Sequence, residues 1–229
     1  MPDLISIYRF LDSHAALNTL VAGRFRVGLV SKFNDPFDQC LGFTGVATPQ
    51  EKKLVENYQT EYLRTLELQR RVLCFCNSVS CPAPWSHYAE KHRGVAFEVK
   101  YPWRDGDILK MTYSHNRPVL DFNKWREIRH DETGRKQYLL KLLVELMRNK
   151  SPGFSFEQEY RLQIGLKYCQ HSDGHDEWRL PDNSLKRVIL GFCCPLDEAI
   201  VRKLLDMNGF TETEVVRAKM CQETYQIIV

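Results

Sequence analysis

Polar and apolar positions alternate through one stretch in the second half of the chain, residues 156–166. Read as a β-strand, this stretch has one apolar face and one polar face. The apolar face carries Tyr160, Leu162, Ile164 and Leu166, and the polar face carries Glu157, Glu159, Arg161 and Gln163. Such a polar face is either solvated or the floor of a cleft, and the solvated alternative is the default for a half-buried strand.

Similar patterns predict the other elements of the fold. Strands are expected at 4–11, 24–29, 72–76, 95–99, 108–113, 188–191, 214–220 and 225–229, and helices at 13–20, 48–70, 85–92, 121–150 and 195–208. Helices and strands are mixed but do not alternate strictly. The sequence therefore predicts an α+β fold with mostly antiparallel sheets and flanking helices. We expect a single domain over 1–229, with the helical segments near 48–70 and 121–150 as candidate insertions.

The start of the second helix is the clearest local signal. Thr48 is a good N-cap, Pro49 suits the first helical position and Glu51 completes a capping box. In this helix we expect a buried stripe of residues four apart. The stripe consists of Leu54, Tyr58, Tyr62 and Leu66. The segment 171–177 is polar throughout and is expected to be a loop.

Composition excludes some classes of partner. The 229 residues include 32 Lys and Arg against 29 Asp and Glu, a net charge of +3 that does not indicate nucleic-acid binding. No apolar run is long enough for a membrane span. The first residues do not resemble a signal peptide, so the eight cysteines are expected to be reduced thiols in the cytoplasm.

Two carboxylates two positions apart, Glu157 and Glu159, are the sharpest chemical signal. On one face of a strand they would lie about 6–7 Å apart. Such a pair suits acid–base catalysis or the stabilisation of a developing positive charge. Arg161 on the same face would hold Glu159 ionised. The alternative is a surface ion pair of little consequence.

A second signal is Trp85-Ser86-His87-Tyr88, where a planar ligand could stack on Trp85 or Tyr88. The alternative is that both rings belong to the core. A zinc site built from Cys74, Cys76, Cys81 and His87 lacks the paired spacing of zinc knuckles, so no metal is expected and Cys74 and Cys76 are read as small buried side chains.

Several short motifs together resemble a bacterial family of unassigned activity, domain of unknown function twenty-nine seventy-one. The motifs are Tyr8-Arg9-Phe10, Phe33-Asn34-Asp35-Pro36-Phe37, Leu73-Cys74-Phe75, Trp85-Ser86-His87-Tyr88-Ala89, His92-Arg93-Gly94-Val95, Lys150 before Glu157-x-Glu159-Tyr160-Arg161, and Val188-Ile189-Leu190-Gly191. They follow the family's order and cover most of the chain. Phe154, Cys76 and Pro84 depart from the family's usual residues.

The layout of this family is similar to that of ADP-ribosyltransferases, with an early basic residue, a central aromatic or Ser element and a late Glu-x-Glu strand. The resemblance implies that Arg9 binds NAD, that Tyr88 stacks on nicotinamide, that Glu159 contacts the nicotinamide ribose and that Glu157 lies near the acceptor. The residues expected to bind the cofactor are Arg9, Asn34, Asp35, Trp85, Ser86, Tyr88 and Arg161, and those expected to be catalytic are Glu159 and Glu157.

Three functions remain open on this basis. The first is an NAD-binding enzyme that transfers ADP-ribose to a macromolecular acceptor or cleaves NAD, in phage defence or a toxin system. The second is a sensor module that binds a nucleotide or a protein without chemistry. The third is a metal-dependent nuclease, which we rank last because Arg161 would compete with a cation.

Overall fold

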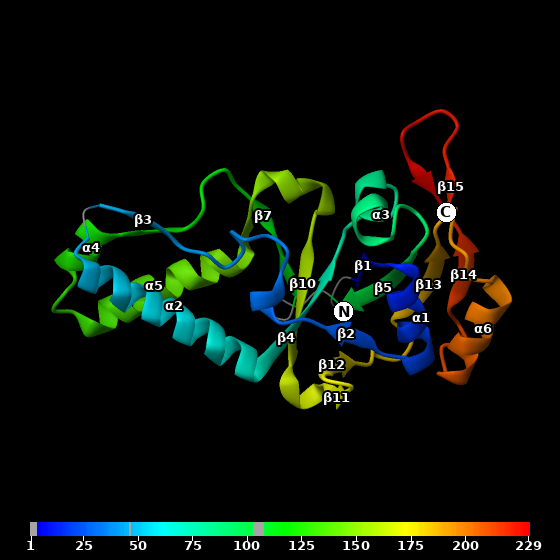
Figure 1. The fold of residues 1–229 in the computed structure, drawn as a ribbon, viewed down its shortest axis with the longest axis horizontal. Coiled ribbons are helices and arrows are strands. Elements are labelled where there is room, and N and C mark those ends of the chain that lie inside the picture. Colours follow the sequence, from blue (N-terminus) through cyan, green and yellow to red (C-terminus); the bar gives the residue numbers. More distant parts are fainter. Residues whose placement is uncertain (1–3, 46, 103–107) are drawn as a thin grey trace.

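A β-rich body and a helical arm make up the structure (Figure 1), a computed structural model that describes residues 4–45, 47–102 and 108–229. The predicted α+β class with several antiparallel sheets is confirmed. The main sheet of the body has the strand order β1 (Leu4–Leu11), β5 (Val95–Pro102), β13 (Leu185–Leu190) and β14 (Glu214–Arg217). β5 pairs antiparallel with β1 and with β13, whereas β13 and β14 are parallel.

A second sheet holds the central strand of the sequence pattern. β10 (Tyr160–Gly165) lies between β4 (Arg70–Phe75) and β6 (Ile108–Lys110), antiparallel to both. The two sheets meet at one isolated antiparallel bridge, where Tyr8 and Cys76 exchange two backbone hydrogen bonds of 2.8 Å. Among the described residues, this bridge is the only backbone pairing between the two sheets. Away from it β1 and β4 separate, and side chains of both strands line the cavity between them.

Smaller sheets complete the fold. β2 (Phe25–Val27), β12 (His175–Trp178) and β11 (Gln170–Ser172) form a three-stranded antiparallel sheet. The loop expected at 171–177 is therefore a hairpin. Asp173 and Gly174 both have positive φ, which allows the tight turn that joins its strands. Three two-stranded sheets pair β3 (Gly42–Thr44) with β8 (Val119–Asp121), β7 (Thr112–Tyr113) with β9 (Asn149–Lys150), and β15 (Lys219–Met220) with β16 (Ile227–Ile228).

Helices α1 (Ser13–Ala22) and α6 (Glu198–Met207) flank the main sheet and share its core. The caps of α1 follow the sequence, with Asp12 at the N-terminus and Gly23 in the left-handed conformation at the C-terminus. The short helix α3 (Pro82–Tyr88) packs with Phe10 and Ile189 in a separate small cluster. The described residues also contain three short 3-10 helices, at Val30–Lys32, Pro152–Glu157 and Leu166–Tyr168.

The arm consists of α2 (Pro49–Gln69), α4 (Phe122–Glu127) and α5 (Glu132–Arg148), which enclose a core of their own. The capping box of Thr48 and Glu51 forms as predicted. The expected stripe on α2 is wrong at its first two positions, because Val55 is fully buried whereas Leu54 and Tyr58 are 38% and 44% exposed. Tyr62, by contrast, packs against the core of the arm as predicted. The expected helix over 121–150 divides into α4 and α5, and Asp131 caps the second.

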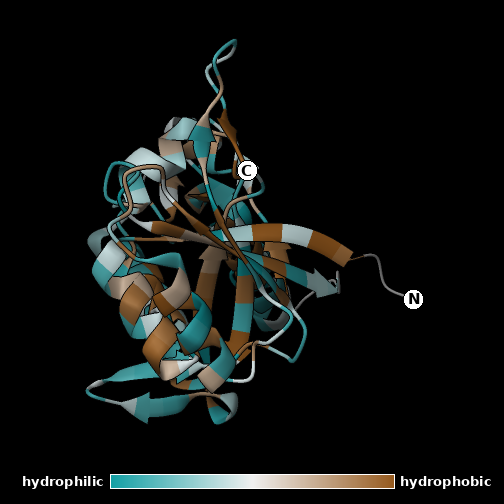
Figure 2. Ribbon diagram, turned by 90° about the vertical axis from the view of Figure 1, so that its right-hand side faces the viewer, coloured by the Kyte–Doolittle hydropathy of each residue, from teal (hydrophilic) through white to brown (hydrophobic). Residues whose placement is uncertain are grey.

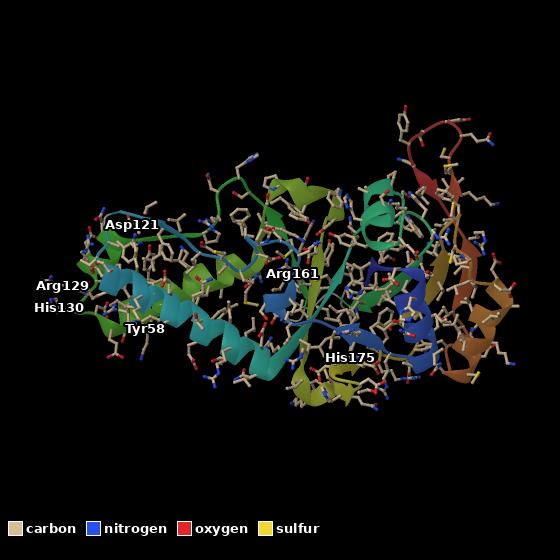
Figure 3. The ribbon with its side chains drawn as sticks, viewed as in Figure 1. Tyr58, Asp121, Arg129, His130, Arg161 and His175 are labelled. Atoms are coloured by element: carbon tan, nitrogen blue, oxygen red, sulfur yellow. The ribbon has the colours of Figure 1, made fainter. Side chains whose placement is uncertain are left out.

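The colouring by hydropathy shows hydrophobic and hydrophilic segments alternating along the helices and strands (Figure 2), as amphipathic elements require. Arg161 lies in the middle of the molecule, whereas Arg129 and His130 lie at the far end of the arm (Figure 3). Among the described residues, no helix combines the length and the apolar composition that a bilayer crossing demands.

Candidate functional site

The two carboxylates of the sequence signal do not both lie on a strand. Glu157 ends a 3-10 turn, Gln158 takes the left-handed conformation with φ of 43°, and β10 begins only at Tyr160. The strand expected over 156–166 is therefore wrong for its first residues. The polar side chains are nevertheless enclosed, since Glu157, Glu159 and Arg161 are only 4%, 2% and 3% exposed. The solvated alternative for this face does not hold.

A chain of ion pairs of alternating sign connects these groups. Lys150 Nζ lies 2.6 Å from Glu157 Oε2 and 2.8 Å from Glu159 Oε2. Arg161 Nε donates to Glu159 Oε1 at 2.6 Å, and Arg161 Nη1 donates to Asp38 Oδ1 at 2.9 Å. At the other end the hydroxyl of Tyr88 donates to Glu157 Oε1. Each charge therefore has a partner of opposite sign, as buried charges require.

The two carboxyl groups differ in their protonation. Burial opposes the ionisation of Glu159, but Arg161 and Lys150 outweigh it and lower its pKa to about 2. For Glu157, burial outweighs the contacts with Lys150 and Tyr88, and its pKa is raised. Burial and the hydrogen bond to Glu157 also raise the pKa of Tyr88. Close carboxyl groups with pKa values shifted in opposite directions are typical of acid–base sites.

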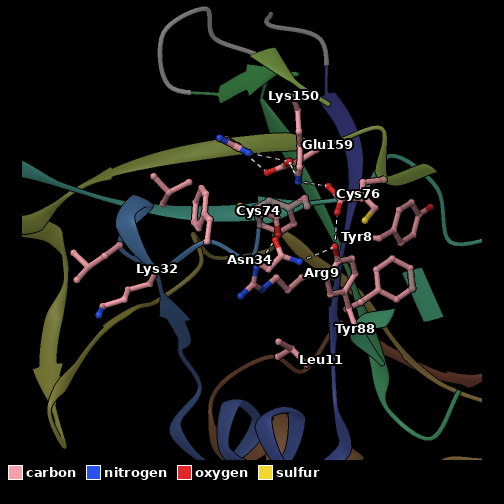
Figure 4. A pocket seen from close by; sticks show the side chains of 18 of the residues that line it. Tyr8, Arg9, Leu11, Lys32, Asn34, Cys74, Cys76, Tyr88, Lys150 and Glu159 are labelled. Atoms are coloured by element: carbon pink, nitrogen blue, oxygen red, sulfur yellow. Dashed lines mark hydrogen bonds and ion pairs between the residues drawn. The ribbon is translucent and has the colours of Figure 1, made fainter. Parts of the chain in front are cut away.

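A cavity of about 430 Å³ opens beside this chain, in the size range of small-molecule sites. Its wall is formed by β1, β4, the segment 28–34, Tyr88 and the ion-paired cluster. Lys150 and Glu159 lie at one end of the cavity and Leu11 at the other, with Arg9, Asn34 and Tyr88 between them (Figure 4). Asn34 Nδ2 donates to the Tyr88 hydroxyl at 3.5 Å.

Arg9 reaches into this space from β1. Its Nη1 donates to the carbonyl of Cys74 at 2.9 Å, which connects the two sheets where their strands separate. Its Nε is buried and has no hydrogen-bond partner. Burial lowers the pKa of this guanidinium, and Cys74, Cys76 and Glu159 oppose that shift. A guanidinium with an unused donor can accept an anionic group of a ligand.

Six of the nine predicted site residues line the cavity: Arg9, Asn34, Tyr88, Glu157, Glu159 and Arg161. Trp85 does not, because it is fully buried, with its Nε1 donating to the Val79 carbonyl at 2.7 Å and its ring edge-on to Phe10. The core alternative therefore describes Trp85. Ser86 is exposed and lies outside the cavity lining. Asp35 is also outside the lining. It is buried, and its Oδ1 accepts from Phe37 N at 2.9 Å within its own turn.

Sequence reasoning missed two charged residues that organise the site. Lys150 is noted above only as part of a motif, and Asp38 is not singled out, yet both are ion-paired and have side chains only 5% and 1% exposed. A lysine directly before a Ser-Pro-Gly turn and within ten residues of two glutamates is a usable signal. Asp38 offers none, because its partner lies 123 positions away.

Cys74 and Cys76 also line the cavity, and burial raises the pKa of both thiols. They are therefore poor nucleophiles at neutral pH. Within the described ranges, no three His, Cys, Asp or Glu side chains are grouped so that they could hold a metal ion.

No family model matches this chain, and no curated protein or solved structure is significantly similar to it. These comparisons therefore give no functional information, and the geometry of the site is the main guide to function. That geometry combines an arginine with an unused donor, several aromatic rings and a carboxyl group with a raised pKa around one cavity.

Proposed function

We propose that this protein binds a nucleotide of the NAD type in the cavity and breaks its nicotinamide–ribose bond, either hydrolysing NAD or transferring ADP-ribose to a macromolecular acceptor. One observation carries the proposal. Arg9, Tyr88 and Glu157, which are distant in the sequence, line the same 430 Å³ cavity. Arg9 supplies a donor for a phosphate group, Tyr88 an aromatic ring and Glu157 a carboxyl group. The resemblance to ADP-ribosyltransferases supports the same reaction by analogy.

Cleavage of the nicotinamide–ribose bond is favoured by a negative charge next to the ribose. As the C–N bond breaks, its electron pair leaves with nicotinamide and positive charge develops on the ribose. A water molecule or acceptor nucleophile then bonds to the ribose carbon and gives up its proton. A carboxylate stabilises the sugar cation, and a carboxylate can take the proton.

Glu157 suits these roles better than Glu159. Both oxygens of Glu159 are bound by cations, since Oε1 accepts from Arg161 and Oε2 lies 2.8 Å from Lys150. Glu157 has one oxygen on Lys150, and among the described residues its other oxygen accepts from the Tyr88 hydroxyl alone. A hydroxyl group can rotate away, which frees this oxygen for a ligand. We therefore assign the reacting carboxyl group to Glu157 and a supporting negative charge to Glu159.

The test is the release of nicotinamide from NAD by the purified protein. Glu157→Gln should reduce the rate at least 100-fold, the usual scale for the loss of a group that stabilises transition-state charge or transfers a proton. Glu56→Gln, on the exposed face of α2, is the matched control and should keep the full rate. Equal rates in the two variants, or no nicotinamide from the wild-type protein, would contradict the proposal.

A second candidate, a nucleotide sensor without chemistry, has its own support. Every charged group from Asp38 to Glu157 already has a partner, so the cluster is stable without a reaction. This candidate predicts that NAD raises the melting temperature of the protein and that no product forms. The nuclease alternative is not carried forward, because a metal ion would have to displace Lys150 from both glutamates and Arg161 from Glu159.

A further inference from the structure

We infer that Lys150 is a positioning residue shared by two glutamates that have different tasks. It helps to hold Glu159 as a permanent anion in the cavity wall and leaves Glu157 as the carboxyl group that gains and loses a proton. The use of that proton rests on the proposed function, but the division of tasks rests on the contacts of the cluster.

Lys150 is fixed from several sides. Its side chain is 5% exposed, and two of its three N–H donors serve Glu157 Oε2 at 2.6 Å and Glu159 Oε2 at 2.8 Å. The ammonium group also lies 4.7 Å from the ring centre of Phe154. The backbone is held because β9 pairs with β7, where Tyr113 is opposite Lys150. The hydroxyl oxygen of Tyr113 in turn accepts a hydrogen bond from the backbone N–H of Glu159 at 2.8 Å.

The surroundings of the two glutamates are unequal. Glu159 has a second cation, Arg161, which is itself held by Asp38. Glu157 has Lys150 as its only ion-pair partner among the described residues. Charged or titratable groups also face Glu157 from the neighbouring elements. They are Tyr88 on α3, Tyr113 on β7, Cys76 after β4 and Glu159 before β10.

The charge count explains which group exchanges the proton. The chain from Glu157 to Asp38 contains three carboxyl groups and two cations, Lys150 and Arg161. When all are ionised, the chain carries one negative charge, which Arg9 faces across the cavity. When Glu157 is protonated, Lys150 still pairs with Glu159 and Arg161 still pairs with Asp38. The proton can therefore come and go without breaking any other ion pair in the chain.

The test follows the glutamate side-chain carboxyl carbons by ¹³C NMR during a pH titration of the labelled protein. In the wild-type protein, Glu157 should titrate above the usual range for glutamate, and Glu159 should stay ionised to about pH 2. Lys150→Met should raise the midpoint of Glu157 more than that of Glu159, which keeps Arg161. Lys150→Arg, which keeps the cation, should restore most of the wild-type difference. Lys136→Met, which breaks only an exposed pair with Glu132, should change neither midpoint.

If Glu159 titrates above Glu157 in the wild-type protein, the inference is overturned even when no variant folds. Equal shifts of both midpoints in Lys150→Met would overturn it as well. The titration needs no substrate, so a protein that releases no nicotinamide can still confirm the role of Lys150. Where nicotinamide is released, the acidic limb of the pH–rate profile should follow the measured midpoint of Glu157 in the wild-type and Lys150→Arg proteins.

Discussion

The guanidinium of Arg161 and the carboxylate of Asp38, 123 positions apart in the sequence, form a two-pronged ion pair in which both side chains are almost fully buried. Arg161 also lies over the ring of Phe33, with 4.9 Å between the guanidinium carbon and the ring centre. The segment that carries Phe33, Asn34 and Asp38 is thereby held against β10. Asn34 and Arg161 both line the cavity, so this pair fixes part of the cavity wall.

Asp38→Asn should destabilise the fold by about 3 kcal/mol, because it removes a negative charge from a buried pair and leaves Arg161 with Glu159 alone. Urea unfolding monitored by circular dichroism gives the change in free energy. Glu61→Gln, which removes an exposed partner 3.9 Å from Arg64, is the control and should change stability by less than about 0.5 kcal/mol. Similar effects of both substitutions would mean that the Asp38 pair is not buried in solution.

Three consecutive residues after α3, Glu90, Lys91 and His92, have positive φ values of 49°, 53° and 68°. A left-handed conformation costs an L-residue other than glycine about 1 kcal/mol. Lys91 is exposed, so Lys91→Gly should stabilise the protein by up to about 1 kcal/mol. The same change in a helix, Lys136→Gly in α5, should destabilise it by about 1 kcal/mol. Thermal unfolding measures the stability change in both variants. A loss of stability in Lys91→Gly would contradict the left-handed turn.

Removal of the capping box should destabilise α2, the helix of the arm that begins there. Thr48→Ala takes away the side-chain acceptor for Glu51 N, and should cost about 1 kcal/mol of stability. Thr60→Ala, at an exposed position inside the same helix, should instead stabilise it by up to about 0.5 kcal/mol, because alanine has the higher helix propensity. Chemical denaturation with a far-UV signal measures both. Effects of the same sign would contradict the assigned start of α2.

Local signals such as the capping box of α2 explain why much of the fold can be predicted from the sequence. Caps act within a few residues, so Thr48 and Glu51 mark the start of α2 correctly. Two local predictions fail for physical reasons. The positive φ at Gln158 turns the chain just before β10 and takes Glu157 off the strand. The start of α3 at Pro82 directs Trp85 towards Val79 and Phe10 in the core.

The site depends more strongly on contacts between distant segments. The polar face could be identified from the alternation in the sequence, but its burial follows from Asp38, Tyr88 and Lys150, which three separate elements supply. Nothing in the order of residues shows that these elements meet. The role of Glu159 as a fully paired anion also depends on Lys150, whose reach is visible only in the folded chain.

The pH dependence of stability should reflect Glu159. Its pKa is lowered to about 2 in the folded protein, against 4.5 as the ordinary value. The folded state therefore binds this proton less readily than the unfolded state, and the stabilisation is present above about pH 4.5 and is lost as the pH falls towards 2. In Glu159→Gln the decline in unfolding free energy between pH 5 and pH 3 should be shallower than in the wild-type protein. An equally steep decline, measured by urea unfolding at each pH, would show that Glu159 is not held ionised by its two cations.

In the proposed function, the cavity beside Glu157 holds a nucleotide with its ribose next to that carboxyl group. The most direct measurement is a crystal structure of the Glu157→Gln variant, in which turnover should be slow, grown with saturating NAD. We expect the phosphate groups at Arg9 and the nicotinamide ribose between Tyr88 and residue 157. An empty cavity at saturating NAD, or NAD bound elsewhere on the protein, would contradict the claim.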